Sequence, residues 1–163
     1  LVYKKGSGLD GVTSIMDPRL KDKRVGIQAG VPAADQVAKA GLMVKAKPYL
    51  LQVDTRYFNP MKDMVADIRS GEIDVGVLWG PFAGYYAKRD GEPLEVVPIL
   101  DEVPGTQKLD YRMTMGVRTS DVAWKHQLND IIQKRQGDID QILLDYGVPI
   151  LDEDRKLITA ARH

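Results

Sequence analysis

Residues 59–79 have the sequence NPMKDMVADIRSGEIDVGVLW, and this stretch decides the class of fold. Asn59 is a good helix N-cap, and Pro60 suits the first helical position because its backbone nitrogen needs no partner there. Four apolar residues then recur at helical spacing: Met61, Met64, Val65 and Ile68. We expect this helix to end at Gly71, and the apolar run at residues 73–79 is typical of a strand covered on both faces. A helix followed by a buried strand indicates an α/β fold.

The same alternation extends on both sides of this stretch. The pattern predicts further strands at residues 23–28, 49–53 and 94–100, and further helices ending near residue 40 and spanning residues 82–88. Helical crossovers return each strand in the same direction, so repeated strand and helix units imply a mostly parallel sheet flanked by helices.

The last third of the chain has a different pattern. Residues 111–117 alternate large apolar with polar or small side chains, which predicts a strand with one buried face or a strand that runs between two lobes. Residues 124–143 carry apolar residues at helical spacing and predict a long helix, broken near Gly137. Gly147 and Pro149 are expected to end it.

The composition is that of an ordinary globular domain. The chain has 163 residues, 44% hydrophobic and 28% charged, which fits one domain. Its 23 basic and 23 acidic residues cancel, so no net field attracts nucleic acid. Its longest apolar runs are far shorter than the ~20 residues that span a bilayer. We therefore expect neither a nucleic-acid partner nor a membrane span.

No pattern typical of a catalytic or metal site is present in the sequence. The chain has no cysteine, which excludes disulfides, thiolate nucleophiles and cysteine-ligated metals. His126 has no second metal-ligand type at a suitable spacing, His163 is terminal, and no G-x-S-x-G elbow occurs. Residues 26–30 lack the spacing of a dinucleotide-binding turn, and the acidic residues 152–154 lack a calcium-loop framework. We expect no enzymatic activity, no cofactor and no metal.

The order of these motifs resembles the second lobe of type II periplasmic binding proteins. A strand, the turn Gln28-Ala29-Gly30 and a helix are followed by SGEID at residues 70–74, by Pro81, and by a C-terminal helix pair. The likeness covers nearly the whole chain. In that family two lobes, joined by two crossing strands, close over a ligand.

This resemblance implies a division of the chain into three parts. Residues 1–10 would be a crossing strand and a remnant of the first lobe, and residues 11–110 the α/β second lobe. Residues 111–163 would be the returning crossing strand and C-terminal helices that pack on the first lobe. We therefore expect an incomplete first lobe, most of which would lie upstream of Leu1.

Five short motifs carry a narrower resemblance. They are VDTRY at 53–57, LWGPFAGY at 78–85, YRMTMGVR at 111–118, WKH at 124–126 and LLDYGVP at 143–149. Together, and in this order, they are similar to the quinoprotein-dehydrogenase-associated binding proteins, the MxaJ/XoxJ accessory proteins of methanol dehydrogenase. Membership implies a location in the periplasm and a pyrroloquinoline-quinone (PQQ)-dependent methanol dehydrogenase as partner.

Two departures from the wider family argue against an amino-acid ligand. Amino-acid receptors carry a hydroxyl after the turn at Gly30, whereas Val31 and Pro32 offer none. Those receptors also place an aspartate where this chain has Trp79. A buried ligand ammonium would then lack a partner, at a cost of about several kcal/mol.

Side chains that follow successive parallel strands should meet at one edge of the sheet. The predicted surface, suited to a protein segment, a peptide or a bulky, partly apolar small molecule, consists of Gly30, Val31, Asp54, Arg56, Trp79, Gly80 and Phe82. Two alternatives stay open: Trp79 could instead be a core residue, and Asp54 could pair locally with Arg56 to fix a loop.

Three classes of function fit the sequence to different degrees. The first is an accessory protein of a quinoprotein dehydrogenase that assists its maturation or activation. The second is a receptor that delivers a small, partly apolar solute to an ABC transporter. The third is the effector domain of a transcription regulator, which needs a helix-turn-helix with a basic face that the sequence lacks.

Overall fold

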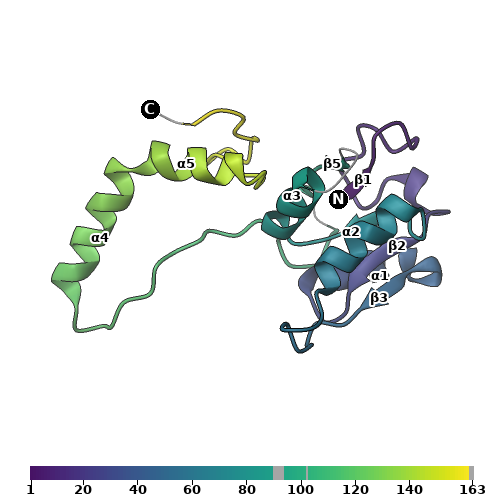
Figure 1. The fold of residues 1–163 in the computed structure, drawn as a ribbon, viewed down its shortest axis with the longest axis horizontal. Helices are drawn as coiled ribbons and strands as arrows, with labels where there is room; N and C mark the ends of the chain where they lie inside the picture. The colour runs from purple at the N-terminus through teal and green to yellow at the C-terminus, as the bar shows by residue number, and fades with distance from the viewer. Residues whose placement is uncertain (90–93, 102, 162–163) are drawn as a thin grey trace.

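A single five-stranded sheet organises the first two thirds of the computed structural model, which describes residues 1–89, 94–101 and 103–161 (Figure 1). Its strands are β1 (Val2–Lys4), β2 (Val25–Gln28), β3 (Lys47–Tyr49), β4 (Val75–Val77) and β5 (Leu94–Val96). Their order across the sheet is β3-β2-β4-β1-β5. Strand β2 is parallel to β3 and β4, whereas β1 is antiparallel to β4 and β5. The predicted mostly parallel α/β sheet is confirmed.

Five α-helices accompany the sheet within the described residues. They are α1 (Pro32–Lys39), α2 (Pro60–Ser70), α3 (Gly80–Arg89), α4 (Val122–Lys134) and α5 (Gln136–Asp145). Two short 3-10 turns span Pro18–Leu20 and Leu42–Lys45, and their residues Leu20 and Leu42 belong to the same apolar cluster as α1. As predicted, the Asn59 side chain caps α2 by accepting from the backbone nitrogen of Lys62, and Gly71 ends the helix with a positive φ.

Two apolar clusters form the core on opposite faces of the sheet. Alternate residues of β1 point to opposite faces, and Tyr3 belongs to one cluster while Val2 belongs to the other. The first cluster includes Val37 of α1, and the second includes Met64 and Ile68 of α2. The apolar stripe predicted for α2 is therefore buried against the sheet.

Several element boundaries differ from those predicted. Strand β3 ends at Tyr49, so residues 50–53 belong to a loop and not to a strand. Helix α3 begins at Gly80 and takes in Pro81, because proline is tolerated in the first helical turn. The break between α4 and α5 falls at Arg135 and not at Gly137.

The two predicted crossing segments are placed differently from each other. Residues 1–10 include β1, which lies inside the sheet between β4 and β5. Residues 111–117, predicted as a strand, pair with no strand among the described residues, and their side chains are largely exposed. Alternation alone does not make a strand when no neighbouring edge is there to pair with it.

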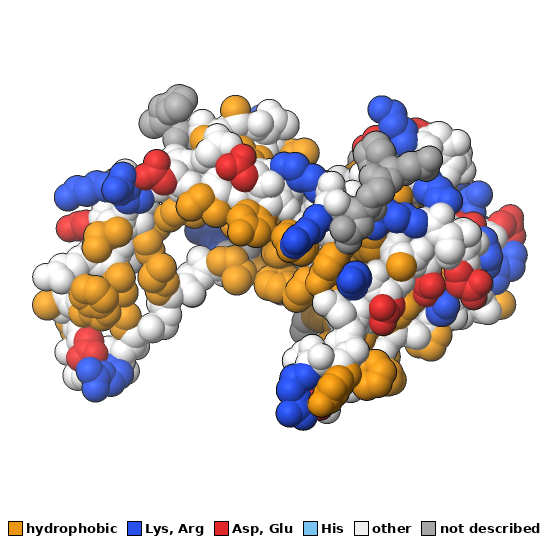
Figure 2. Space-filling view, in the orientation of Figure 1, with side chains coloured by type: hydrophobic (Ala, Val, Ile, Leu, Met, Phe, Trp, Pro, Cys, Tyr) orange, Lys and Arg blue, Asp and Glu red, His pale blue; other side chains and the backbone are white. Residues whose placement is uncertain are grey.

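The C-terminal residues 111–161, here called the arm, lead away from the sheet domain and return to it. Figure 1 shows the extended segment running out to α4, and α5 coming back toward α3. Within the described residues, α4 buries no side chain. Figure 2 shows hydrophobic side chains lining the hollow between the arm and the sheet domain. No helix in the described part of the chain has the length and apolar character to cross a bilayer.

Candidate binding surface

The loops that follow β2, β3 and β4 leave the same edge of the sheet, because these three strands are parallel. Gly30 follows β2 and has a φ of 79°, a left-handed conformation that favours glycine. A Cβ atom at Gly30 would lie 3.5 Å from Cδ2 of Leu51, in the loop after β3. The first two of these loops are therefore in contact.

Trp79 and Phe82 form an exposed aromatic pair where β4 passes into α3. Their ring centroids are 5.6 Å apart, and their side chains are 46% and 40% exposed. Exposure of this size excludes the alternative that Trp79 is a core residue. Gly80, between them, begins α3 and lies close to Pro149: a Cβ on Gly80 would be 3.0 Å from Cγ of Pro149.

Asp54 and Arg56 form a local ion pair, which is one of the two alternatives that the sequence allowed for these residues. The Arg56 guanidinium contacts the Asp54 carboxylate at 2.6 Å and 2.9 Å, and the backbone nitrogen of Arg56 also donates to it at 3.1 Å. These hydrogen bonds hold the pKa of Asp54 below its ordinary value. The guanidinium also lies over the Tyr57 ring, 5.5 Å from its centroid. The pair fixes the loop, so neither charge is free for a ligand in this conformation.

Val31 stands at the N-terminus of α1 without capping it. Its side chain makes no cap hydrogen bond, and Pro32 occupies the first helical turn. Pro32 has no N–H to donate, so this helix start presents fewer donors to an anion than a serine-capped start would. That a carboxylate site is weakened here stays a prediction.

The predicted surface residues thus fall into three local groups. Trp79 and Phe82 are in ring contact around Gly80, Asp54 is bonded to Arg56, and Gly30 with Val31 lies beside the loop after β3. No hydrogen bond or ion pair between described residues joins one group to another. That the seven residues act as one binding surface stays a prediction.

Three tyrosines extend the aromatic pair and were not predicted as part of the site. Phe82 stacks on Tyr86 at 6.3 Å, Tyr86 contacts Tyr85 edge-on at 5.1 Å, and Tyr85 stacks on Tyr146 at 5.8 Å. The signal was present, since residues 82, 85 and 86 share one helical face. The contact with Tyr146 joins residues far apart in the chain, which periodicity does not reveal.

A groove beside the loop after β3 also lay outside the prediction. Its volume is about 440 Å³. It is lined by Pro48, Tyr49, Leu50, Gln52, Val53, Asp54, Phe58, Pro60 and Asp63. The Tyr49 hydroxyl donates to Asp67, which also pairs with Lys47 at 2.9 Å, so this wall is tied to α2. Burial opposes ionisation of Asp67, but the hydrogen bonds from Tyr49 and Lys47 outweigh it and keep its pKa below the ordinary value.

Comparison with known proteins gives relatives of one kind. No protein-family model matches the chain. Protein MoxJ of Methylorubrum extorquens is 28% identical over 156 residues, which is 86% of this chain and 51% of MoxJ. The crystal structure of periplasmic binding protein XoxJ from Methylobacterium extorquens AM1 superposes with a TM-score of 0.78 at 36% identity, covering 93% of this chain and 67% of XoxJ. This chain belongs to the XoxJ/MxaJ family of periplasmic binding proteins.

A second family structure agrees in fold. MxaJ from Methlophaga aminisulfidivorans MPT superposes with a TM-score of 0.67 at 22% identity, covering 92% of this chain and 65% of MxaJ. The chain spans about half the length of the curated relative MoxJ. The predicted family and the type II periplasmic-binding-protein-like fold are both confirmed.

Proposed function

We propose that this member of the XoxJ/MxaJ family is a periplasmic accessory protein that associates with a PQQ-dependent methanol dehydrogenase and assists its maturation or activation. It would bind its partner and catalyse no reaction itself. Family membership supports this proposal, because XoxJ is a periplasmic binding protein and the five sequence motifs resemble the accessory proteins of methanol dehydrogenase. Within the described residues no three histidine, aspartate or glutamate side chains gather as a metal site requires.

The exposed Trp79 and Phe82 pair is the observation that carries the proposal. Two half-exposed aromatic rings at the end of a central strand suit a protein segment, since aromatic residues are enriched where proteins bind one another. The two charged residues of the predicted surface, Asp54 and Arg56, are already bonded to each other. A zwitterionic solute would therefore find no free counter-charge from either of them.

The arm would pack its apolar helix face on a first lobe. Trp124 and Ile131 of α4 lie seven residues apart and so share one helix face; each is about half exposed and has no apolar cluster of described residues against it. A helix with such a stripe is stable when another surface covers it. In the two-lobed arrangement that the sequence predicts, residues 11–110 would form the second lobe, and residues 111–163 would lead back to the first lobe and pack on it.

The test replaces Trp79 by alanine in the intact protein and measures both dehydrogenase affinity and the melting curve. We expect the affinity to fall by about thirtyfold or more, the effect of losing a ~2 kcal/mol hot spot. Unfolding stability should fall by much less than the ~3 to 5 kcal/mol that a buried tryptophan costs. Unchanged affinity with a large stability loss would contradict the proposal.

Trp124→Ala is the matched control for affinity. Trp124 is the same residue type, but it lies on α4, whose apolar face would be covered by the first lobe and not by the dehydrogenase. It should leave dehydrogenase affinity within about threefold of the unmodified protein. Equal losses in both variants would mean that Trp79 has no special part in partner binding.

The groove beside Phe58 supports one alternative, a receptor for a small, partly apolar solute of an ABC transporter. Its volume of about 440 Å³ lies in the range of small-molecule sites. A thermal-shift screen with small alcohols, acids and peptides separates the two functions, because a specific solute raises the melting temperature. A strong shift that Phe58→Ala abolishes would favour the receptor.

A further inference from the structure

A small hollow lies at the sheet edge opposite the candidate binding surface. Lys23 and Asp74 lie at the start of β2 and β4, and Lys4 lies at the end of the antiparallel β1, so all three meet at this edge. They line the hollow together with Ser7, and the apolar side chain of Ile73 forms part of its wall. Its position separates it from the residues proposed to bind the dehydrogenase.

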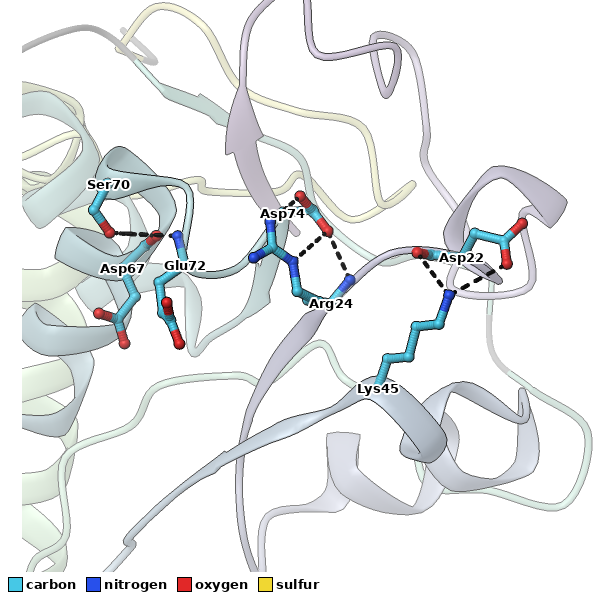
Figure 3. A network of polar contacts seen from close by, with 7 residues as sticks. All are labelled: Asp22, Arg24, Lys45, Asp67, Ser70, Glu72 and Asp74. Atoms are coloured by element: carbon cyan, nitrogen blue, oxygen red, sulfur yellow. Dashed lines mark hydrogen bonds and ion pairs between the residues drawn. The ribbon is translucent and has the colours of Figure 1, made fainter.

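The hollow carries an excess of positive charge. Lys4 and Lys23 are half-buried, and neither makes an ion pair with a carboxylate of the described residues. The one carboxylate in the hollow, Asp74, is already occupied by Arg24, as Figure 3 shows. The Arg24 guanidinium donates to it at 2.9 Å and 3.2 Å, and the Arg24 backbone nitrogen donates at 2.8 Å. Asp74 and Arg24 form an ion pair, and the charge of Lys23 also acts on Asp74, so the residues that line the hollow hold two lysines and no second carboxylate.

The size of the hollow restricts what can bind there. Its volume is about 170 Å³. This corresponds to roughly five or six water molecules at about 30 Å³ each, well below the roughly 300 Å³ of a typical organic-ligand site. The apolar wall at Ile73 reduces solvent screening and strengthens a charge interaction inside. The Ser7 hydroxyl makes no hydrogen bond to another described residue and can donate to an anion.

From these observations we propose that Lys4, Lys23 and Ser7 bind a small tetrahedral oxyanion, of the charge and size of inorganic phosphate. Two ammonium groups match a dianion in charge, and ammonium-to-phosphate hydrogen bonds are among the stronger ones in proteins. Arg24 stays with Asp74 and shapes the wall. Occupancy of this site would link the stability of the sheet domain to the phosphate concentration around it.

The experiment titrates inorganic phosphate into the intact protein by calorimetry, with a parallel thermal-shift series at constant ionic strength against sodium chloride. Phosphate should bind and raise the melting temperature above that in chloride. Lys4→Gln and Lys23→Gln should each weaken phosphate binding by about tenfold, the loss of one charge-assisted contact. Lys23→Arg, which keeps the charge, should retain binding.

Lys21→Gln is the matched control, because Lys21 is an exposed lysine two residues from Lys23 and does not line the hollow. It should bind phosphate like the unmodified protein.

Two results would overturn the proposal. One is an equal loss of phosphate binding in Lys21→Gln, which would mean that only the net charge of the protein matters; the other is phosphate binding no stronger than that of chloride. Acetate binding as tightly as phosphate would overturn the assignment to a tetrahedral dianion. Should Lys4→Gln fail to fold, Lys23→Gln decides the matter alone.

Discussion

The sheet domain and the arm use similar apolar patterns with opposite results. Met64 and Ile68 on α2 recur at helical spacing and are buried, whereas Trp124 and Ile131 on α4 recur in the same manner and are half exposed. The difference lies in what faces each helix, since α2 packs on the sheet and no residue of α4 belongs to either apolar cluster of the described residues. Apolar periodicity therefore specifies a helix and its apolar face, but not the partner that covers that face.

The two regions meet closely where α3 contacts the end of α5. A Cβ atom on Gly84 would lie 1.8 Å from the carbonyl oxygen of Gly147, so the two backbones touch where no side chain fits. Gly147 ends α5 in a Schellman motif, in which the Val148 nitrogen donates to Leu143 and the Gly147 nitrogen to Leu144. The arm is thus held to the sheet domain through backbone as well as side chains.

The largest expected effect is the contrast between Ile68→Ala and Ile131→Ala. Ile68 is buried in the core, and its truncation should lower the free energy of unfolding by about 2 to 5 kcal/mol. Ile131 is 52% exposed, and its truncation should cost within about 0.5 kcal/mol in this chain of 163 residues. Urea unfolding measures both. A core-sized loss for Ile131→Ala would mean that the face of α4 is covered, and the contrast would fail.

Gly84→Ala should loosen the contact between the arm and the sheet domain while both regions stay folded. The added methyl group collides with backbone, which cannot move aside like a flexible side chain, and overpacking of this kind costs about 1 to 3 kcal/mol. Limited proteolysis and small-angle scattering should show a looser arm. Gly116→Ala is the control, because a Cβ there has no neighbour within 4 Å. An unchanged cleavage pattern in Gly84→Ala would contradict the contact.

Ion pairs offer a third contrast, between long-range and local partners. Asp74 bonds Arg24, which precedes the neighbouring strand and is 50 residues away in sequence, whereas Asp138 in the arm bonds Arg135 only three residues away. Hydrogen bonds from Arg24 outweigh burial and keep the pKa of Asp74 below its ordinary value near 3.8. The stabilisation is therefore present above about pH 4 and is lost as pH falls through the lowered pKa.

Asp74→Asn should accordingly lower the melting temperature at pH 7 by more than Asp138→Asn. The stability gap between Asp74→Asn and the unmodified protein should close as pH falls below about 4, because Asp74 of the unmodified protein is then protonated and as uncharged as the asparagine. Melting curves from pH 3 to 7 measure this. A gap that stays constant across that range would show that the ion pair is not its source.

The smallest expected effect concerns Lys88 on α3. Its ammonium group donates to the carbonyl oxygens of Asp145 at 2.8 Å and Leu144 at 3.3 Å, at the C-terminal end of α5. Lys88→Met should cost about 0.3 to 1 kcal/mol, the usual value of a cation at a helix C-terminus. Hydrogen exchange should speed up in α5 and stay unchanged in α2. Equal changes in both helices would contradict a local cap.

The fold was predictable at positions where the residue types strongly favour one kind of local structure. Asn59 with Pro60 marked the start of α2, Gly71 marked its end, and the apolar run before Trp79 marked the central strand β4. The predicted strand at residues 111–117 was wrong as a strand, because pairing depends on an available sheet edge and not on the strand's own alternation.

The candidate surface was predictable only as far as topology carries it. Parallel strands bring the residues after β2, β3 and β4 to one edge, and the exposure of Trp79 fits that expectation. The ring contact between Tyr85 and Tyr146 and the hollow around Lys4 and Lys23 were not predictable. Both depend on distances between segments remote in sequence, which no local pattern contains.

The sheet domain and the arm each contain one of the two tryptophans of the chain: Trp79 follows β4, and Trp124 lies on α4. Each indole is roughly half open to water, so its emission should shift toward the blue when another surface covers it. Trp79→Phe leaves an optical reporter of the arm, and Trp124→Phe leaves a reporter of the aromatic pair. The protein thus carries its own pair of fluorescent labels, with which covering of either region can be followed in solution without an added dye.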